Sequence, residues 1–286
     1  MRLPGPDHSA PAKLNLFLHV VGRRADGYHL LQSAFALIDR ADRLRFAVRA
    51  DGRIARVNDV AGLAADDDLA VRAARRLQQA TGTSLGADIE LEKEIPIGGG
   101  LGGGSSDAAA TLIVLNRLWK TRFDDAALAA LGLELGADVP FFIFGRNAWA
   151  EGVGERLAPL DVPSRWYVVL TPPVRVSTAA VFSAPELTRN TEALKMEDFS
   201  ARAQDFGVDP RFRNDLERVV CARYPQVREH LEWLRGRGHA RMTGSGACVF
   251  APFDSNEAAR RVLDELPAAM SGFIARGLER HPLREQ

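Results

Sequence analysis

Six glycines occupy the seven positions from Gly98 to Gly104, and this run constrains the fold more than any other segment. Glycine has no Cβ, so successive backbone N–H groups in such a run can turn toward a single point. An alanine-rich apolar stretch from Ser105 to Trp119 follows directly and predicts a buried helix. Because a helix N-terminus carries a partial positive charge, the loop and the helix together predict an anion-binding site.

Three other classes of glycine-rich loop compete with this interpretation. A Walker A loop ends in Gly-Lys followed by Ser or Thr, whereas Gly104 is followed directly by Ser105, which excludes that class. The first, third and sixth residues of the run match a dinucleotide-binding fingerprint formally. However, the acidic residues at a suitable distance, Asp124 and Asp125, follow a predicted helix instead of a strand. A flexible turn that binds nothing stays open as the third interpretation.

Composition limits the function classes that are open to the chain. Lys+Arg and Asp+Glu each count 37, so no net charge attracts nucleic acid or an anionic membrane. No apolar run approaches the roughly 18 residues of a membrane span, and 1–7 lacks the apolar core of a signal peptide. Neither Cys221 and Cys248 nor the six histidines follow a metal-ligand spacing, so no protein metal site is predicted. We expect a cytoplasmic protein without nucleic-acid or membrane partners.

Hydrophobic periodicity predicts a mixture of strands and helices. Residues 12–21 alternate between apolar and polar, which is typical of a strand with one buried face. A non-helical corner is expected at 136–140, before the apolar run 141–144. The other expected elements are strands at 44–48, 87–95, 166–170 and 272–275, hairpins at 147–160 and 240–253, and helices from an acidic cap at 66–68 to 80 and at 105–119, 125–135, 214–222, 226–235 and 255–266. A domain boundary is expected in the region between the hairpin at 147–160 and Pro172-Pro173, and the chain is divided after residue 160.

Two charged residues lie in segments that favour a specific role. Lys13 is one of four lysines in an arginine-rich chain, and it shares the polar side of the first predicted strand with Asn15. Asp138 lies in the corner before Pro140, where a carboxylate can be held rigidly. A solvated lysine on an exposed strand face is the alternative for Lys13. An aspartate that caps the segment before the proline is the alternative for Asp138.

The segment Pro96-Ile97-Gly98-Gly99-Gly100-Leu101-Gly102-Gly103-Gly104-Ser105-Ser106 resembles the phosphate loop of the GHMP kinases, a superfamily of small-molecule kinases. Four further blocks are similar to the 4-diphosphocytidyl-2-C-methyl-D-erythritol kinase family within it. They are Pro11-Ala12-Lys13-Leu14-Asn15-Leu16, Arg24-Ala25-Asp26-Gly27-Tyr28-His29, Gly136-Ala137-Asp138-Val139-Pro140-Phe141-Phe142 with Glu151-Gly152-Val153-Gly154-Glu155, and Met242-Thr243-Gly244-Ser245-Gly246-Ala247. The loop alone indicates the superfamily, and the second and third blocks indicate the family.

The resemblance implies an α+β GHMP kinase fold with the active site in the cleft between two domains. The N-terminal domain, 1–160, would bind ATP through Pro96 to Ser106, and the C-terminal domain, 161–286, would bind the substrate. Asp138 would be the catalytic base, and Lys13 beside it would keep the carboxylate ionised and offset charge on the transferring phosphoryl group. Mg²⁺ would arrive mainly on the nucleotide, with the serine hydroxyls at the end of the loop close to it.

The resemblance also implies a small-molecule substrate that carries a cytidine diphosphate group. Tyr28 and Phe182 would stack on the cytosine, His29 would form hydrogen bonds to its edge, and Asn15 and Thr178 would contact the substrate. From residue type alone, a satisfied loop histidine and core aromatic residues are equally open. The implied reaction is ATP plus 4-diphosphocytidyl-2-C-methyl-D-erythritol giving ADP and the 2-phosphate.

Three questions stay open at the level of sequence. The turn Thr243-Gly244-Ser245-Gly246 is either a second backbone nest at the active site or a plain tight turn. A GHMP kinase whose substrate lacks cytosine would leave the pair Tyr28-His29 without a partner. A nucleotide-binding protein without catalytic activity is an alternative from a different class, although it gives no reason for both Lys13 and Asp138 to be present.

Overall fold

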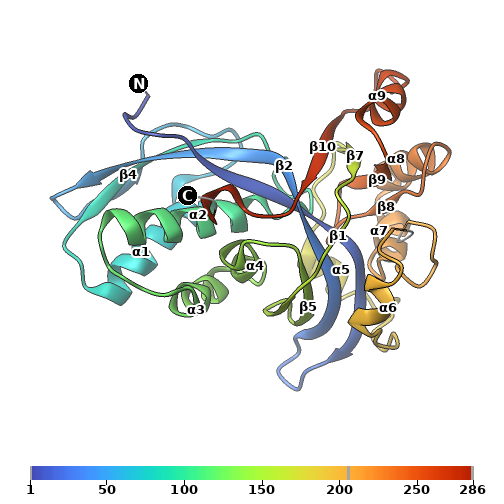
Figure 1. Ribbon diagram of the computed structural model, residues 1–286, viewed down its shortest axis with the longest axis horizontal. Coiled ribbons are helices and arrows are strands. Elements are labelled where there is room, and N and C mark those ends of the chain that lie inside the picture. The colour runs from blue at the N-terminus through green and yellow to red at the C-terminus, as the bar shows by residue number, and fades with distance from the viewer. Residues whose placement is uncertain (1, 205–206, 285–286) are drawn as a thin grey trace.

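The computed structural model describes residues 2–204 and 207–284, and two long antiparallel strands form its centre (Figure 1). Strand β1 (His8–Arg23) pairs with β2 (His29–Arg49) along most of its length. The strand predicted at 12–21 is confirmed, but the expectation that only one of its faces is buried was wrong. Lys13, Asn15 and Phe17 are as buried as the leucines between them. Phe17, for example, packs against aromatic rings from the C-terminal half of the chain.

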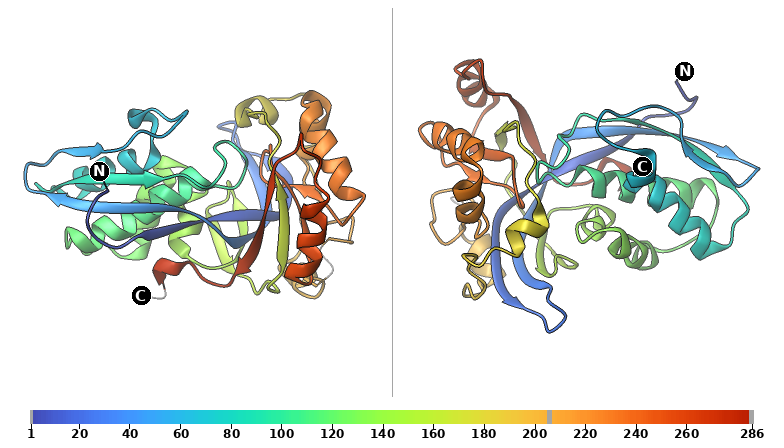
Figure 2. Two further views of the ribbon diagram at one scale, coloured as in Figure 1. Left: turned by 90° about the horizontal axis from the view of Figure 1, so that it is seen from above. Right: turned by 180° about the vertical axis from the view of Figure 1, so that it is seen from behind.

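Among the described residues the sheet has ten strands, and β2 pairs with more of them than any other strand. One edge of β2 pairs with β1, and the other pairs in turn with β5 (Ala148–Gly152), β10 (Gly272–Leu278) and β4 (Gly86–Glu92). The remaining strands are β3 (Ile54–Arg56), β6 (Arg156–Pro159), β7 (Trp166–Leu170), β8 (Arg241–Met242) and β9 (Val249–Phe253), and the order along the main path is β3-β4-β2-β10-β7-β9-β8. In the right-hand view of Figure 2 the blue strands β1 and β2 run from the half with the green helices to the half with the orange helices.

The described N-terminal half contains the α-helices α1 (Leu69–Thr81), α2 (Gly103–Leu118), α3 (Asp125–Leu135) and α4 (Val139–Phe144), and a 3-10 turn at Ala65–Asp67 precedes α1. Helix α1 begins where predicted because the Asp68 carboxylate accepts a hydrogen bond from the Ala70 N–H at 2.8 Å. The apolar run predicted to follow a non-helical corner at 136–140 is helix α4, and the corner ends at Asp138. Pro140 lies in the first turn of α4, where its missing N–H has no intrahelical partner to lose.

The C-terminal half contains α5 (Thr178–Phe182), α6 (Met196–Ser200), α7 (Glu217–Arg223), α8 (Pro225–Arg235) and α9 (Asn256–Asp264). The helices expected at 214–222, 226–235 and 255–266 are therefore confirmed with shifted ends, whereas α5 and α6 were not expected. Strand β10 pairs with both β7 and β2, and Leu283 after it packs in the core beside α2 and α4. The domain boundary after residue 160 stays a prediction.

The α+β prediction is confirmed, and the mixed sheet is covered by helices in both halves (Figures 1 and 2). No helix within residues 2–204 and 207–284 is both long and apolar enough to span a lipid bilayer. Both cysteines are free thiols; Cys248 is buried, and Cys221 is partly exposed. Burial raises the pKa of the Cys248 thiol to about 12, so it stays protonated at neutral pH.

Candidate functional site

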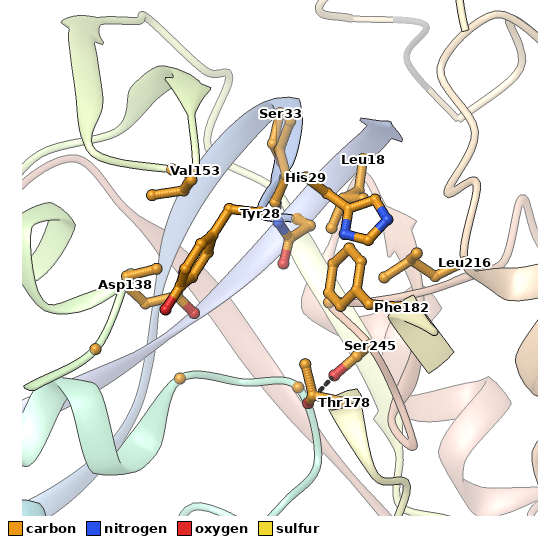
Figure 3. A pocket seen from close by; sticks show the side chains of 18 of the residues that line it. Leu18, Tyr28, His29, Ser33, Asp138, Val153, Thr178, Phe182, Leu216 and Ser245 are labelled. Atoms are coloured by element: carbon orange, nitrogen blue, oxygen red, sulfur yellow. Dashed lines mark hydrogen bonds between the residues drawn. The ribbon is translucent and has the colours of Figure 1, made fainter. Parts of the chain in front are cut away.

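A cavity of about 920 Å³ lies where the glycine loop, the turn between β1 and β2, the N-terminus of α4 and the helix α5 meet. Most of the residues predicted to bind or react line it: Lys13, Asn15, Tyr28, His29, Gly98, Gly100, Gly102, Ser105, Asp138, Thr178 and Phe182. They come from segments far apart in the sequence, and Figure 3 shows several of their side chains directed into one space. The fold therefore brings the predicted residues of both halves together.

Lys13 and Asp138 form an ion pair inside this cavity. The Lys13 ammonium lies 3.3 Å from Asp138 Oδ2, donates to Asn15 Oδ1 at 2.5 Å and lies 5.2 Å from the centre of the Phe35 ring. Lys13 is 3% exposed, so the alternative of a solvated lysine is wrong. Asp138 occupies the N-cap position of α4, but its side chain makes no capping hydrogen bond and faces Lys13 instead. This arrangement argues against a purely capping role for the aspartate.

Asn15 anchors the pair to the surrounding backbone. Its amide nitrogen donates to Ser33 Oγ at 2.9 Å, and its backbone N–H donates to Thr243 Oγ1 at 2.9 Å. Ser33 in turn donates to the Phe17 carbonyl oxygen. The position of the Lys13 ammonium is thus fixed by a buried network, which limits its freedom to move away from Asp138.

The glycine loop interlocks with the turn at 243–246. Gly98, Gly100 and Gly102 all have positive φ angles, of 75°, 77° and 74°. A Cβ on Gly100 would overlap the carbonyl oxygen of Thr243, and one on Gly244 would come within 2.8 Å of the Gly100 carbonyl oxygen. The 243–246 turn therefore lines the cavity beside the loop. It contributes to the same site, which the sequence alone left undecided.

The predicted loop residues do not all face the cavity. Its lining includes Gly98, Gly100, Gly102 and Ser105, whereas the Leu101 side chain lies in the hydrophobic core. Pro96, Ile97, Gly99, Gly103, Gly104 and Ser106 are also outside the lining. The Ser106 hydroxyl, in the first turn of α2, is fully buried and has no hydrogen-bond partner among the described residues. It therefore lies behind the lining, whereas Ser105 is the serine of this helix that borders the cavity.

At the other end of the cavity lie three aromatic side chains. The rings of His29 and Phe182 are 5.0 Å apart with an interplanar angle of 35°. Tyr28 is 64% exposed, and in Figure 3 its ring lies across the cavity from Phe182 and is directed toward Asp138. The Thr178 hydroxyl pairs with the Ser245 hydroxyl at 2.7 Å, which ties α5 to the second glycine turn (Figure 3).

Several residues of the site were not predicted. Lys93 forms ion pairs with Asp107 at 2.7 Å and with Asp42, and Asp42 also accepts the Ile95 N–H at 2.8 Å. This cluster fixes both ends of the glycine loop. Burial raises the pKa of the Asp107 carboxyl well above its ordinary value, and the Lys93 ammonium acts in the opposite direction. The one feature of the sequence that could have indicated this cluster is the scarcity of lysine, because Lys93 is one of only four.

Comparison with known proteins agrees with this geometry. The GHMP kinases N terminal domain matches 68–146, and the GHMP kinases C terminal domain matches 191–272. The chain is 61% identical to the 4-diphosphocytidyl-2-C-methyl-D-erythritol kinase of Thiobacillus denitrificans, with 96% of each chain covered. It is 57% identical to the enzyme of the same name from Aromatoleum aromaticum, covering 97% of this chain and 95% of the relative.

Among solved structures, a crystal structure of 4-(cytidine 5'-diphospho)-2C-methyl-D-erythritol kinase matches with a TM-score of 0.82 at 38% identity, covering 95% of this chain and 99% of the other. Sequence and fold agree over nearly the whole length of these proteins. The chain therefore belongs to the 4-diphosphocytidyl-2-C-methyl-D-erythritol kinase family of the GHMP kinases.

Proposed function

We propose that this protein transfers the γ-phosphoryl group of ATP to the 2-hydroxyl group of 4-diphosphocytidyl-2-C-methyl-D-erythritol. The observation that carries the proposal is the ion pair of Lys13 and Asp138, 3.3 Å apart in a cavity that the glycine loop also lines. Phosphoryl transfer needs a positioned acceptor hydroxyl, charge neutralisation on the phosphates and a group that takes the proton. The cavity contains residues suited to each of these tasks.

In the proposed reaction the Asp138 carboxylate takes the proton of the substrate hydroxyl as its oxygen bonds to the γ-phosphorus. The bond from that phosphorus to the bridging β–γ oxygen breaks, and ADP leaves with the electron pair. The Lys13 ammonium offsets negative charge on the transferring group. Its burial strengthens this effect, because a charge acts more strongly where water is excluded.

The glycine loop is proposed to hold the ATP phosphates, with Gly98, Gly100 and Gly102 in the conformations that turn backbone N–H groups inward. No group of three or more His, Cys, Asp or Glu side chains that could hold a metal ion occurs in the described part of the chain. A magnesium ion that arrives on the nucleotide keeps several waters and needs few protein ligands. The hydroxyl of Ser105, which lines the cavity at the start of α2, is proposed to contact a phosphate oxygen or that ion.

The aromatic end of the cavity is proposed to bind the cytidine diphosphate group. Tyr28 and Phe182 face each other across a space that suits a flat base, and His29 provides a ring nitrogen at its edge (Figure 3). Asn15, which binds Lys13, and Thr178, which binds Ser245, also line the cavity and are proposed to contact the remainder of the substrate. A cytoplasmic location without nucleic-acid or membrane partners is part of the same proposal.

The test is a coupled assay of ADP release with the cytidine-linked substrate, run on the parent protein and on Asp138→Asn. We expect the variant to lose about 10²- to 10⁴-fold in kcat, because its amide cannot accept the proton at neutral pH. Asp264→Asn, on the exposed end of α9, is the control and keeps parental activity. Full activity of Asp138→Asn would remove the base assignment. Turnover of a different alcohol by the parent, without turnover of this substrate, would remove the proposed acceptor.

A further inference from the structure

Arg189 connects the histidine and the phenylalanine at the aromatic end of the cavity. It lies in the segment between α5 and α6 and is partly buried. Its Nε donates to His29 Nε2 at 3.0 Å, and its terminal nitrogens donate to the carbonyl oxygens of Leu187 at 3.0 Å, Phe182 at 2.9 Å and Ala184 at 2.7 Å. One guanidinium group thereby joins the first residue of β2 to the loop that follows α5.

The contact with Arg189 determines which nitrogen of His29 carries the proton. A guanidinium group donates hydrogen bonds and cannot accept them, so Nε2 must be the unprotonated, accepting nitrogen. Burial, together with the positive charges of Arg189 and Arg23, lowers the pKa of His29, which keeps the ring neutral at neutral pH. The single ring proton therefore lies on Nδ1. In Figure 3 this nitrogen is on the side of the ring that faces Tyr28, while Nε2 faces away.

We propose that Arg189 is a positioning residue that makes His29 a fixed hydrogen-bond donor at Nδ1 and so selects cytosine over uracil. The inference rests on the proposed function, because it concerns the base of that substrate. Cytosine presents an acceptor at N3, whereas N3 of uracil carries a hydrogen and donates. A donor held opposite this position pairs with cytosine and meets a second donor in uracil, which leaves two buried groups unpaired.

The same guanidinium group also sets the stacking surface. Because it binds the carbonyl oxygens of Phe182 and Ala184, it fixes the loop that presents the Phe182 ring beside His29. The hydrogen bond from His29 and the stacking on Phe182 thus both depend on Arg189. A lysine at this position would keep the charge, but it lacks the planar fork that reaches four acceptors in different directions.

The first test needs no substrate and no measurement of activity. Long-range ¹H–¹⁵N NMR of the ¹⁵N-labelled protein distinguishes a protonated from an unprotonated ring nitrogen, and the spectrum of His29→Asn assigns the His29 signals. We expect Nδ1 protonated and Nε2 unprotonated at neutral pH. A proton on Nε2 would overturn the proposal whatever the activity of the enzyme.

The second test compares cytidine- and uridine-linked substrates in Arg189→Met, which removes the donors and roughly keeps the length. We expect the preference for cytidine to fall about 10- to 100-fold through KM, with kcat changed much less. Arg218→Gln, an exposed arginine on α7, is the control and keeps the preference. Unchanged preference in Arg189→Met would overturn the selection role. If the parent turns over neither substrate, the proposed function fails, and the NMR result still decides the tautomer.

Discussion

The interlock of the two glycine turns allows a sharp test, the replacement of Gly100 by alanine. A Cβ at this position would overlap the Thr243 carbonyl oxygen and lie 3.0 Å from that of Gly246. Both obstacles are backbone atoms, so they cannot rotate away as a side chain would. Gly98→Ala is the matched control: its φ of 75° is close to the 77° of Gly100, but its Cβ would meet nothing within 4 Å.

The two substitutions share one energetic cost and differ in a second. An alanine in the left-handed region costs about 1–2 kcal/mol in either variant. Overlap with a packed neighbour adds about 1–3 kcal/mol in Gly100→Ala alone. Since 1 kcal/mol shifts the midpoint of thermal unfolding by about 2–4 °C in proteins of this size, we expect Gly100→Ala to unfold roughly 2–12 °C below Gly98→Ala.

Thermal unfolding and the KM for ATP are the measurements. We expect the KM for ATP to rise more in Gly100→Ala, because the displaced loop no longer aligns its N–H groups. Gly244→Ala inserts a Cβ into the same contact from the other side, so the double variant loses less stability than the sum of the two single losses. Equal unfolding temperatures for Gly98→Ala and Gly100→Ala, or strictly additive losses, would refute the interlock.

Three further predictions concern single side chains. Lys13→Arg lowers kcat by at least about 10-fold in the ADP-release assay, because a planar fork neither fits the buried site nor replaces a point charge; parental kcat would contradict this. Tyr28→Ala raises the KM for the cytidine-linked substrate by about 5- to 100-fold through lost stacking, and an unchanged KM would exclude a stacking role. Burial and, to a smaller extent, the charge of Arg284 lower the pKa of His281 to about 4. Between pH 6.5 and 4 this histidine is therefore protonated in the unfolded chain and neutral in the folded chain. The free energy of unfolding therefore falls by up to about 3 kcal/mol as the pH is lowered from 6.5 to 4. It falls less in His281→Asn, whose amide oxygen can still accept the hydrogen bond from the Leu283 N–H. Equal losses for the two proteins in urea titrations would refute this assignment.

The strand β2 shows where periodicity failed as a predictor. Only 44–48 was expected as a strand, although β2 extends over His29–Arg49. Much of the strand is covered on both faces, so the period of two is lost. Some of its polar residues are buried as well, and they have partners elsewhere in the chain: Asp42 pairs with Lys93, and Arg45 with Glu90. Such partners come from distant segments and leave no local pattern.

The residues of the candidate site differ in how far the sequence predicts them. The glycine run and the helix after it follow from residue type alone, because few other functions require so many missing side chains. Lys13 and Asp138 were paired by the family resemblance, since nothing in their local sequences indicates that they meet. Arg189 escaped prediction because three of its four partners are backbone carbonyl oxygens, which carry no residue-type signature.

The buried polar side of β1 explains why the site lies where it does. Removing an ammonium from water costs several kcal/mol unless a carboxylate and other polar partners compensate. Lys13 has such partners in Asp138 and Asn15, and Asn15 is held by Ser33 and Thr243 from two other segments. Burying Lys13 therefore requires β1, β2, the corner before α4 and the second glycine turn to meet at one point. The contacts that make the lysine tolerable in the fold are the same contacts that assemble the proposed catalytic pair.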